Sequence, residues 1–484
     1  MTQLHDLTAL EQAAAVRARE VSPTELVRHA LARVEALDAG LGAFVTVTPE
    51  RALAAAAAAD ARVLRGGELP PLLGVPTAIK DLNNTAGVRT TFGCPVFADF
   101  VPTVDDAVVT ALAAAGTISL GKTNTPEFGF PCYTDNALVG PARTPWDPAR
   151  LAGGSSGGAA VAVAAGMVPF AQGSDGGGSI RIPASVNGLV GIKPARGRVS
   201  NAPLGADVTG LGTNGPLART VRDAAAVLDA MAGPVTGDAT WAPPLPPGET
   251  FLGCADRPVG RLRIGRTVES PMPDAVLDPE VVEALDDAGR LLEDLGHEVV
   301  DVPPGLLTPD VLAAFERVWS LSGTLLPVPA DRVRELRPLT RELRGRGLAL
   351  SARAAMEALT ALRLFARRFI AATADFDVLL APVTTMTPRP LGWFDADGDG
   401  AADFERQKRY AAFTAVYNVT GQPAVSLPLW WTDGGLPIGT MLVGRPADEA
   451  TLIALSARLE EARPWSRRHP PQWDAHRWTG TPVG

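Results

Sequence analysis

The sequence predicts an α/β protein with a central mixed, mostly parallel twisted β-sheet covered by helices on both faces. Between residues 72 and 235, short apolar stretches typical of buried strands alternate with helices rich in Ala and Val. Two such stretches are GVPTAIK (74–80) and GTISLG (116–121). Strand-like segments return at FDVLLAPV (376–383) and QPAVSLPLWW (422–431), so the same texture runs through most of the chain.

The predicted elements follow in order along one domain that spans residues 1–484. The first part contains helices; in its segment SPTELVRHALARVEALD, Ser22 as N-cap and Glu25 three residues later form a capping box. Strands and helices alternate in the second part and again after a Pro- and Gly-rich connection, which argues against independent domains. The expected parts are N-terminal helices at 1–68, a core at 70–235, and a C-terminal part at 236–484 with a helical region at 307–374.

Composition and charge exclude several classes of protein. The net charge of −9 argues against a general binder of nucleic acid or of anionic membranes. The three cysteines, Cys94, Cys132 and Cys254, are far apart and odd in number, so we expect neither a disulfide framework nor a zinc site. No apolar run reaches the roughly 18–20 residues of a membrane span, and the N-terminus is too charged for a signal peptide. We therefore expect a cytoplasmic protein.

Two stretches match binding motifs by their letters alone. GTISLGKT (116–123) fits the phosphate-loop pattern, but its glycine ends a helix, its middle is strand-like and Pro126 would break a following helix. DADGDGAADFER (395–406) begins like a calcium loop, yet its twelfth position is Arg406 where a bidentate Glu is required. We expect neither nucleotide nor calcium at these places.

Two glycine-rich turns that carry serines point to nucleophilic catalysis. GGSSGG (153–158) and DGGGSIR (175–181) lie in the least polar part of the chain, where a flexible linker is not expected. A serine nucleophile needs a base, but no histidine lies between residues 30 and 296. A lysine is the rarer base, and Lys80 ends an apolar strand in the same region.

These residues resemble the amidase signature family. The resemblance rests on GGSSGG, GSDGGGSIRIPA and GLVGIKPARGRVS, with GVPTAIKD and GKTNTPEFG upstream, in the family's order and spacing. It is strong over about 70–230 and continues more weakly through most of the chain. It implies an amidase-signature fold and a Ser–cis-Ser–Lys triad: Lys80 as base, Ser155 on a cis peptide bond as bridge, and Ser179 as nucleophile.

The triad requires an unusual lysine. Lysine ordinarily titrates near about 10.4, so that only about one part in a thousand is neutral near pH 7.4, and burial lowers this value by about 3–5 units. We therefore expect Lys80 to be enclosed, without a carboxylate contact strong enough to hold it charged, and Asp81 to point to the other side of the strand. No metal or organic cofactor is required.

The resemblance also assigns supporting roles. The backbone N–H groups of Gly176, Gly177, Gly178 and Ser179 are expected to form the oxyanion hole.

Ser156, Asp175 and Arg181 are expected to brace the two turns, and Lys122 and Lys193 to be structural.

Three positions depart from the family pattern: Gly176 replaces a side chain that is often Thr, Asn187 replaces a small residue or Cys, and KPA replaces KPT.

The substrate is expected to be a small-molecule amide with an apolar or aryl group. Gly129, Phe130, Pro131 and Cys132 are candidates for the acyl pocket because the family brings this loop to it.

Phe315, Trp319 and Leu325, within 307–374, or LGWF (391–394), would supply an apolar cover.

The alternatives are a carbamate or ester hydrolase with the same triad, the glutaminase subunit of a tRNA-dependent amidotransferase, and a non-catalytic binding protein, against which the intact triad argues. Neither nucleic acid nor membrane is an expected partner, and a homodimer stays open.

Overall fold

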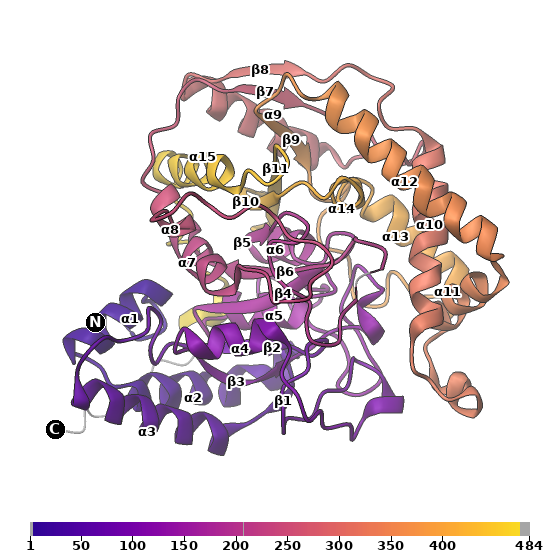
Figure 1. Cartoon of the computed structure of the whole chain (residues 1–484). Helices are drawn as coiled ribbons and strands as arrows, with labels where there is room; N and C mark the ends of the chain where they lie inside the picture. Colours follow the sequence, from indigo (N-terminus) through magenta and orange to yellow (C-terminus); the bar gives the residue numbers. More distant parts are fainter. Residues whose placement is uncertain (1–2, 207, 475–484) are drawn as a thin grey trace.

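The computed structural model describes residues 3–206 and 208–474 (Figure 1). A small sheet lies in the N-terminal part, with strand order β1-β3-β2, and helices surround it. Ser22 accepts the Glu25 N–H and Glu25 accepts the Ser22 N–H, which confirms the predicted capping box. The elements of this part are α1 Ala9–Ala18, α2 Pro23–Leu41, β1 Phe44–Val47, α3 Pro49–Arg65, β2 Pro76–Lys80, α4 Ala107–Ala114 and β3 Ile118–Thr123.

The larger sheet has eight strands in the order β4-β6-β5-β10-β11-β9-β7-β8. Its strands come from both sides of the Pro- and Gly-rich connection, as the single-domain prediction requires. One hydrophobic core cluster includes residues from Ala9 to Trp465. The strands are β4 Phe170–Asp175, β5 Val190–Lys193, β6 Thr213–Ala218, β7 Arg263–Arg266, β8 Glu298–Asp301, β9 Val378–Pro382, β10 Ala424–Trp431 and β11 Pro437–Gly444.

The α/β class and the mixed sheet are confirmed, but the expectation of mostly parallel strands is wrong for this sheet. Only β9-β7 and β7-β8 are parallel neighbours, and the other pairs are antiparallel. The reason is insertion: β4 and β5 run the same way, joined through a helix, but β6 lies between them and opposes both. A short turn joins β10 to β11, which also makes that pair antiparallel.

Helices cover the large sheet, and a helical group stands to one side of it. In Figure 1, α10, α11 and α12 lie together at the right, beside α13 and α14. The remaining helices are α5 Gly157–Ala164, α6 Arg181–Asn187, α7 Val221–Met231, α8 Phe251–Cys254, α9 Pro279–Asp294, α10 Pro309–Ser322, α11 Pro338–Ala349, α12 Ala352–Ala372, α13 Gly400–Tyr410, α14 Ala415–Thr420 and α15 Glu449–Ala462.

The two motif look-alikes fold as ordinary structure. Most of the phosphate-loop match is strand β3, and the calcium-loop match leads into α13, where Asp399 caps the helix and Arg406 pairs with Asp397.

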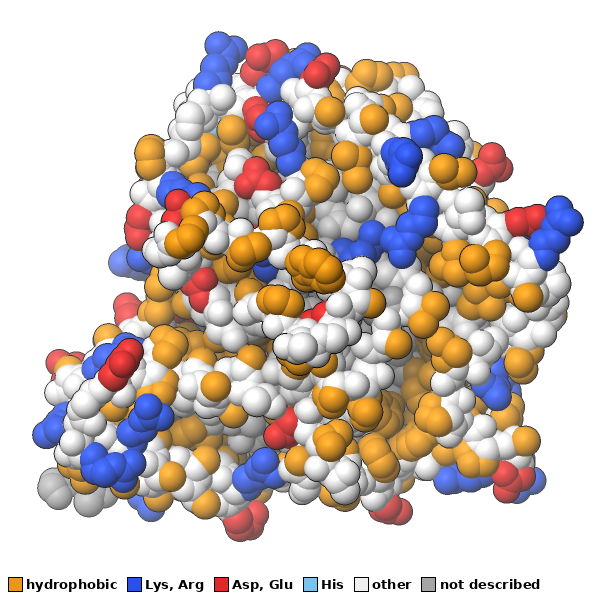
Figure 2. Space-filling model, in the orientation of Figure 1, with side chains coloured by type: hydrophobic (Ala, Val, Ile, Leu, Met, Phe, Trp, Pro, Cys, Tyr) orange, Lys and Arg blue, Asp and Glu red, His pale blue; other side chains and the backbone are white. Residues whose placement is uncertain are grey.

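Among the described residues no group of acidic, His or Cys side chains is arranged to hold a metal ion. No helix in the described part of the chain is long and apolar enough to cross a membrane. Figure 2 shows acidic and basic side chains interspersed over one face.

Candidate active site

Lys80 lies at the end of β2 and is fully buried. Its Nζ donates to Ser155 Oγ at 2.8 Å, to Ser174 Oγ at 3.0 Å and to the Ser174 carbonyl at 3.3 Å. Burial lowers the pKa of Lys80 to about 7, while the charge of Asp175 opposes that shift. The hydrogen-bond partners of this amine are hydroxyl and carbonyl oxygens, so the neutral form is within reach at neutral pH.

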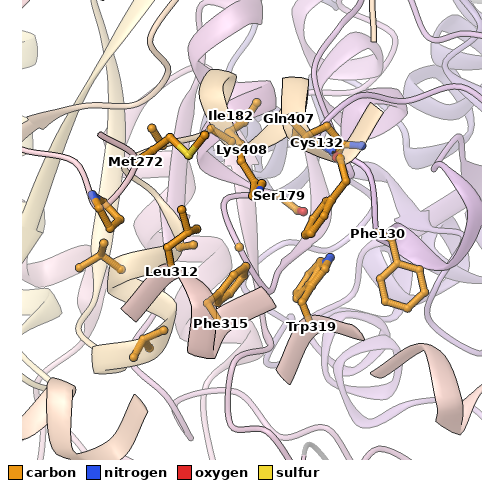
Figure 3. Close-up of a pocket in the computed structure, with 18 of the residues that line it drawn as sticks. Phe130, Cys132, Ser179, Ile182, Met272, Leu312, Phe315, Trp319, Gln407 and Lys408 are labelled. Atoms are coloured by element: carbon orange, nitrogen blue, oxygen red, sulfur yellow. The ribbon is translucent and has the colours of Figure 1, made fainter. Parts of the chain in front are cut away.

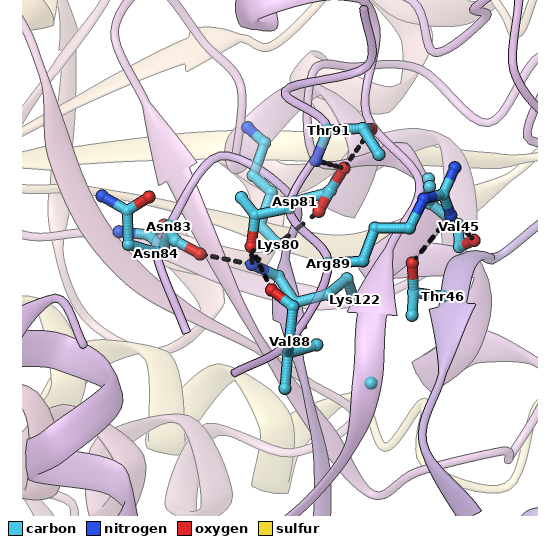
Figure 4. Close-up of polar contacts among 12 residues, drawn as sticks. Val45, Thr46, Lys80, Asp81, Asn83, Asn84, Val88, Arg89, Thr91 and Lys122 are labelled. Carbon is cyan, nitrogen blue, oxygen red and sulfur yellow. Dashed lines mark hydrogen bonds and ion pairs between the residues drawn. The ribbon is translucent and has the colours of Figure 1, made fainter. Parts of the chain in front are cut away.

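Asp81 turns away from the Lys80 amine, as the strand alternation predicts (Figure 4). Its carboxylate accepts from the Thr91 backbone N–H and hydroxyl, and it lies 3.7 Å from Lys122. Lys122 is buried and also donates to the Asn83 carbonyl. Asp81 and Lys122 therefore hold the chain around β2 and leave Lys80 without a carboxylate contact.

The GGSSGG turn is buried and closely packed. The Gly154–Ser155 peptide bond is cis. A Cβ on Gly158 would lie 2.4 Å from both the Ala43 carbonyl oxygen and the Asn124 nitrogen, so only glycine allows this approach. Glycine here serves close contact between backbones, and the turn leads directly into α5.

The second turn follows β4 and is organised by the buried carboxylate of Asp175. It accepts from the Gly178 N–H at 2.8 Å, from the Ile180 N–H at 3.1 Å and from the Arg181 guanidinium at 2.9 and 3.0 Å. Burial alone would raise the pKa of Asp175, but the Arg181 charge and hydrogen bonds hold it well below its ordinary value. Asp175 and Arg181 thus brace the loop that carries Ser179.

The predicted oxyanion hole needs one change. Because the Gly178 N–H is already donated to Asp175, it is not free to bind a substrate oxygen. Gly176 and Gly177 are the partly exposed residues of this loop. The N–H groups of Gly176, Gly177 and Ser179 stay as the predicted donors.

Two residues that the sequence did not point to, Thr414 and Asn418, hold the same loop. Thr414 directly precedes α14, and Asn418 lies within it. The Thr414 hydroxyl donates to the Gly177 carbonyl at 2.6 Å. The Asn418 amide donates to the carbonyl and carboxylate of Asp175 at 3.0 and 2.9 Å, and accepts from Arg181. No local signal identifies them, because more than 230 residues separate them from the loop.

Ser156 joins the two serine turns. Its N–H donates to the Ser179 carbonyl at 3.2 Å, and its hydroxyl donates to the Ser174 carbonyl at 3.1 Å. The Ser174 N–H in turn donates to the Ser156 hydroxyl at 3.2 Å. Ser156 is thus bonded to both β4 and the loop that carries Ser179.

Ser179 opens onto an apolar cavity of about 760 Å³, its open mouth included (Figure 3). Phe130, Pro131 and Cys132 line it, as predicted, and so do Phe315 and Trp319. The other lining residues are Gly177, Ile182, Pro271, Met272, Val311, Leu312, Phe404, Gln407, Lys408, Ala411, Ala412, Ala415, Val416 and Val419.

Three candidates lie elsewhere. Gly129 does not line the cavity; a Cβ there would lie 3.1 Å from Ser155 Oγ, so glycine leaves room for the bridging serine. Leu325 is 70% exposed and outside the cavity lining. Phe394, from the LGWF segment, is buried and stacks on Tyr133 with ring centroids 4.7 Å apart, so it belongs to the core.

The polar side chains in the cavity wall are already engaged. Gln407 accepts from the Cys132 N–H and donates to Asp403. Lys408 pairs with Glu316 and Glu405, each at 2.6 Å. Besides Ser179, the wall therefore offers a substrate mainly apolar surface.

Asn187, which departs from the family pattern, and Lys193, which was expected to be structural, both hydrogen-bond to backbone carbonyls. The Asn187 amide donates to the Ala152 and Pro183 carbonyls, and Lys193 donates to the Pro194 carbonyl. Both side chains are buried, and neither lines the cavity.

The chain thus has a buried lysine bonded to Ser155 and a loop that carries Ser179 at an apolar cavity, and comparisons with known proteins identify the class of protein. The Amidase family model matches residues 25–453. AmiB2 of Mycobacterium tuberculosis, named an amidase, is 42% identical over 447 residues, 91% of this chain and 92% of its own. A glutamyl-tRNA(Gln) amidotransferase subunit of Thioalkalivibrio sulfidiphilus is 37% identical over 492 residues, 96% and 99% of the two chains.

Solved structures agree. A 6-aminohexanoate cyclic dimer hydrolase bound to substrate superposes with a TM-score of 0.89 at 32% identity, covering 97% of this chain and 100% of that one. A bacterial aryl acylamidase superposes with a TM-score of 0.85 at 29% identity, covering 96% and 97%. The protein is thus an enzyme that hydrolyses amide C–N bonds. The chain belongs to the amidase signature family.

Proposed function

We propose that this enzyme hydrolyses uncharged amides with an apolar or aryl group through an acyl-enzyme on Ser179. Neutral Lys80 takes a proton from Ser155, Ser155 takes one from Ser179, and Ser179 Oγ attacks the carbonyl carbon. When the tetrahedral intermediate collapses, the C–N bond breaks and the leaving amine receives the proton through Ser155. Water then releases the acid by the same relay.

The hydrogen bond from Lys80 to Ser155 supports the first step of this relay. The pKa of about 7 supports it further, since roughly half of the amine is neutral near pH 7. The bond between the Ser156 N–H and the Ser179 carbonyl brings the two serine turns together. In the tetrahedral intermediate the oxyanion accepts from the Gly176, Gly177 and Ser179 N–H groups, and one such donor contributes roughly 3–4 kcal/mol in other enzymes.

The single observation that carries the substrate class is the apolar wall around Ser179. Glutamine would bring an α-ammonium and an α-carboxylate, and burying an unpaired charge is costly. Among the described lining residues the one charged side chain is Lys408, which two glutamates already neutralise. This argues against the glutaminase alternative despite the identity to an amidotransferase subunit. An aryl acylamidase among the structural neighbours agrees with an apolar substrate.

The test uses the purified chain beside a Ser179→Ala control. An acyl p-nitroanilide, an aryl carbamate and glutamine are assayed in parallel. We expect chromophore release from the anilide that the control lacks. A faster carbamate reaction would make the enzyme a carbamate hydrolase with the same triad. Ammonia from glutamine alone, or no reaction, would refute the proposal and favour the glutaminase alternative.

A further inference from the structure

Trp319 of α10, which lines the cavity, lies against Gly176 in the loop that carries Ser179. A Cβ on Gly176 would lie 3.3 Å from two carbons of the indole, closer than side chains normally pack. A Cβ on Gly177 would lie 3.6 Å from Phe315, an ordinary contact. Trp319 thus occupies the space that a side chain at position 176 would need.

Neighbouring rings and helices hold the indole in this position. Phe315 stacks on Trp319 with centroids 5.5 Å apart and planes 20° apart, and Phe130 meets it edge-on at 5.7 Å. α10 also packs closely on α11, where a Cβ on Gly347 would lie 2.3 Å from the Ser320 carbonyl oxygen. The indole therefore has little freedom to move away from the loop (Figure 3).

We propose that Trp319, with Gly176, selects acyl groups that have no branch on the carbon next to the carbonyl. The inference rests on the proposed function. A carbonyl oxygen held by the Gly176 and Gly177 N–H groups places its carbon beside the loop that the indole covers. A linear chain passes this point, whereas a second carbon substituent on the adjacent carbon meets the indole.

The first test compares two isomers, butyryl and isobutyryl p-nitroanilide, which differ only in branching. We expect kcat/KM of the wild type to be about 10–200-fold higher for the butyryl isomer. This is the usual discrimination that one carbon produces in an apolar pocket. Trp319→Ala should reduce this ratio by about tenfold or more on the same scale. The matched control is Val318→Ala, which shortens a buried apolar side chain of the same helix that does not line the cavity, and it should leave the ratio within about threefold. An unchanged ratio in Trp319→Ala, or an equal change in Val318→Ala, overturns the proposal.

The second test is a double-mutant cycle between positions 176 and 319. Gly176→Ala should lower kcat/KM for the butyryl isomer by about 10–100-fold, because the loop must shift away from the indole. In the Trp319→Ala background the same change should cost much less, and in the Val318→Ala background it should cost as much as in the wild type. Equal costs in all three backgrounds would overturn the proposal.

Thermal unfolding separates the two possible failures. Gly176→Ala should lower the Tm in the wild type and much less in Trp319→Ala, whatever the enzyme hydrolyses. If the Tm coupling is present but no anilide is cleaved, the proposed function fails while the contact stands. If anilides are cleaved without coupling in Tm or in kcat/KM, the function stands and the role of Trp319 is refuted.

Discussion

The charge state of Lys80 should set the acid limb of the pH–rate profile. The perturbation is a change of pH from about 5 to about 9.5, with an acyl p-nitroanilide that does not itself titrate. The buried amine has a pKa of about 7, lowered from an ordinary 10.5. Because the neutral form is the base, kcat/KM rises with pH through about 7 and is level above about 8.

The size of the effect follows from that value. With a pKa of about 7, the neutral fraction is roughly 90% at pH 8, roughly 9% at pH 6 and roughly 1% at pH 5. We therefore expect kcat/KM to fall about tenfold between pH 8 and pH 6, and about tenfold again by pH 5. Lys80→Ala should lose roughly 10²–10⁴-fold in kcat at pH 8, the usual contribution of a general base.

The chain offers a matched control in Lys193. This lysine is also fully buried, and burial lowers its pKa to about 7, but it donates to the Pro194 carbonyl and not to the triad. Lys193→Met should leave the midpoint of the acid limb within about half a pH unit of the wild type, since a distant charge shifts it little. An acid limb with its midpoint near about pH 4–5 or near about pH 10 would refute the assignment of Lys80 as the base. So would an acid limb that is absent from the pH–rate profile of Lys193→Met.

Three further predictions concern the bridge, the loop and the glycine packing. Ser155→Ala should lower kcat by about 10²–10⁴-fold with an unchanged circular dichroism spectrum, because the proton relay is broken; retained activity would contradict the relay. Asp175→Asn should cost about 3–5 kcal/mol in urea unfolding, since it leaves the buried Arg181 charge unpaired; a loss below about 1 kcal/mol, the usual value of an exposed pair, would contradict this. Gly158→Ala should lower the free energy of unfolding by more than about 1–3 kcal/mol, the usual cost of overpacking. The control is Gly289→Ala in α9, where the new Cβ would meet one carbon at 3.9 Å. It should raise the free energy of unfolding by about 0.5–1 kcal/mol.

Several features could be predicted from the sequence because local chemistry determines them. The capping box at Ser22 and Glu25 follows from residue type and spacing. A lysine at the end of an apolar strand predicted a buried amine, and Lys80 is buried with a lowered pKa. The motif order predicted the family, which the comparisons confirm.

The order of strands in the sheet and the second half of the site depend on contacts between distant residues. The alternation of strands and helices predicted mostly parallel strands, but β6 inserts between β4 and β5 and opposes both, and no local pattern specifies that insertion. Thr414 and Asn418 reach the nucleophile loop across more than 230 residues.

The proposed set of oxyanion donors and the cover of the cavity also depend on the tertiary structure. Which N–H groups remain free depends on the Asp175 carboxylate, whose orientation takes the Gly178 N–H out of the set. The sequence shows Gly176 as a departure from the family pattern. Its structural reason is that Trp319 of α10 lies where a side chain at position 176 would be. By itself the sequence predicted the family and the residues proposed to react, because their chemistry belongs to residue types at characteristic spacing. The tertiary structure alone decided the shape of the space around them, because packing between distant segments defines that space.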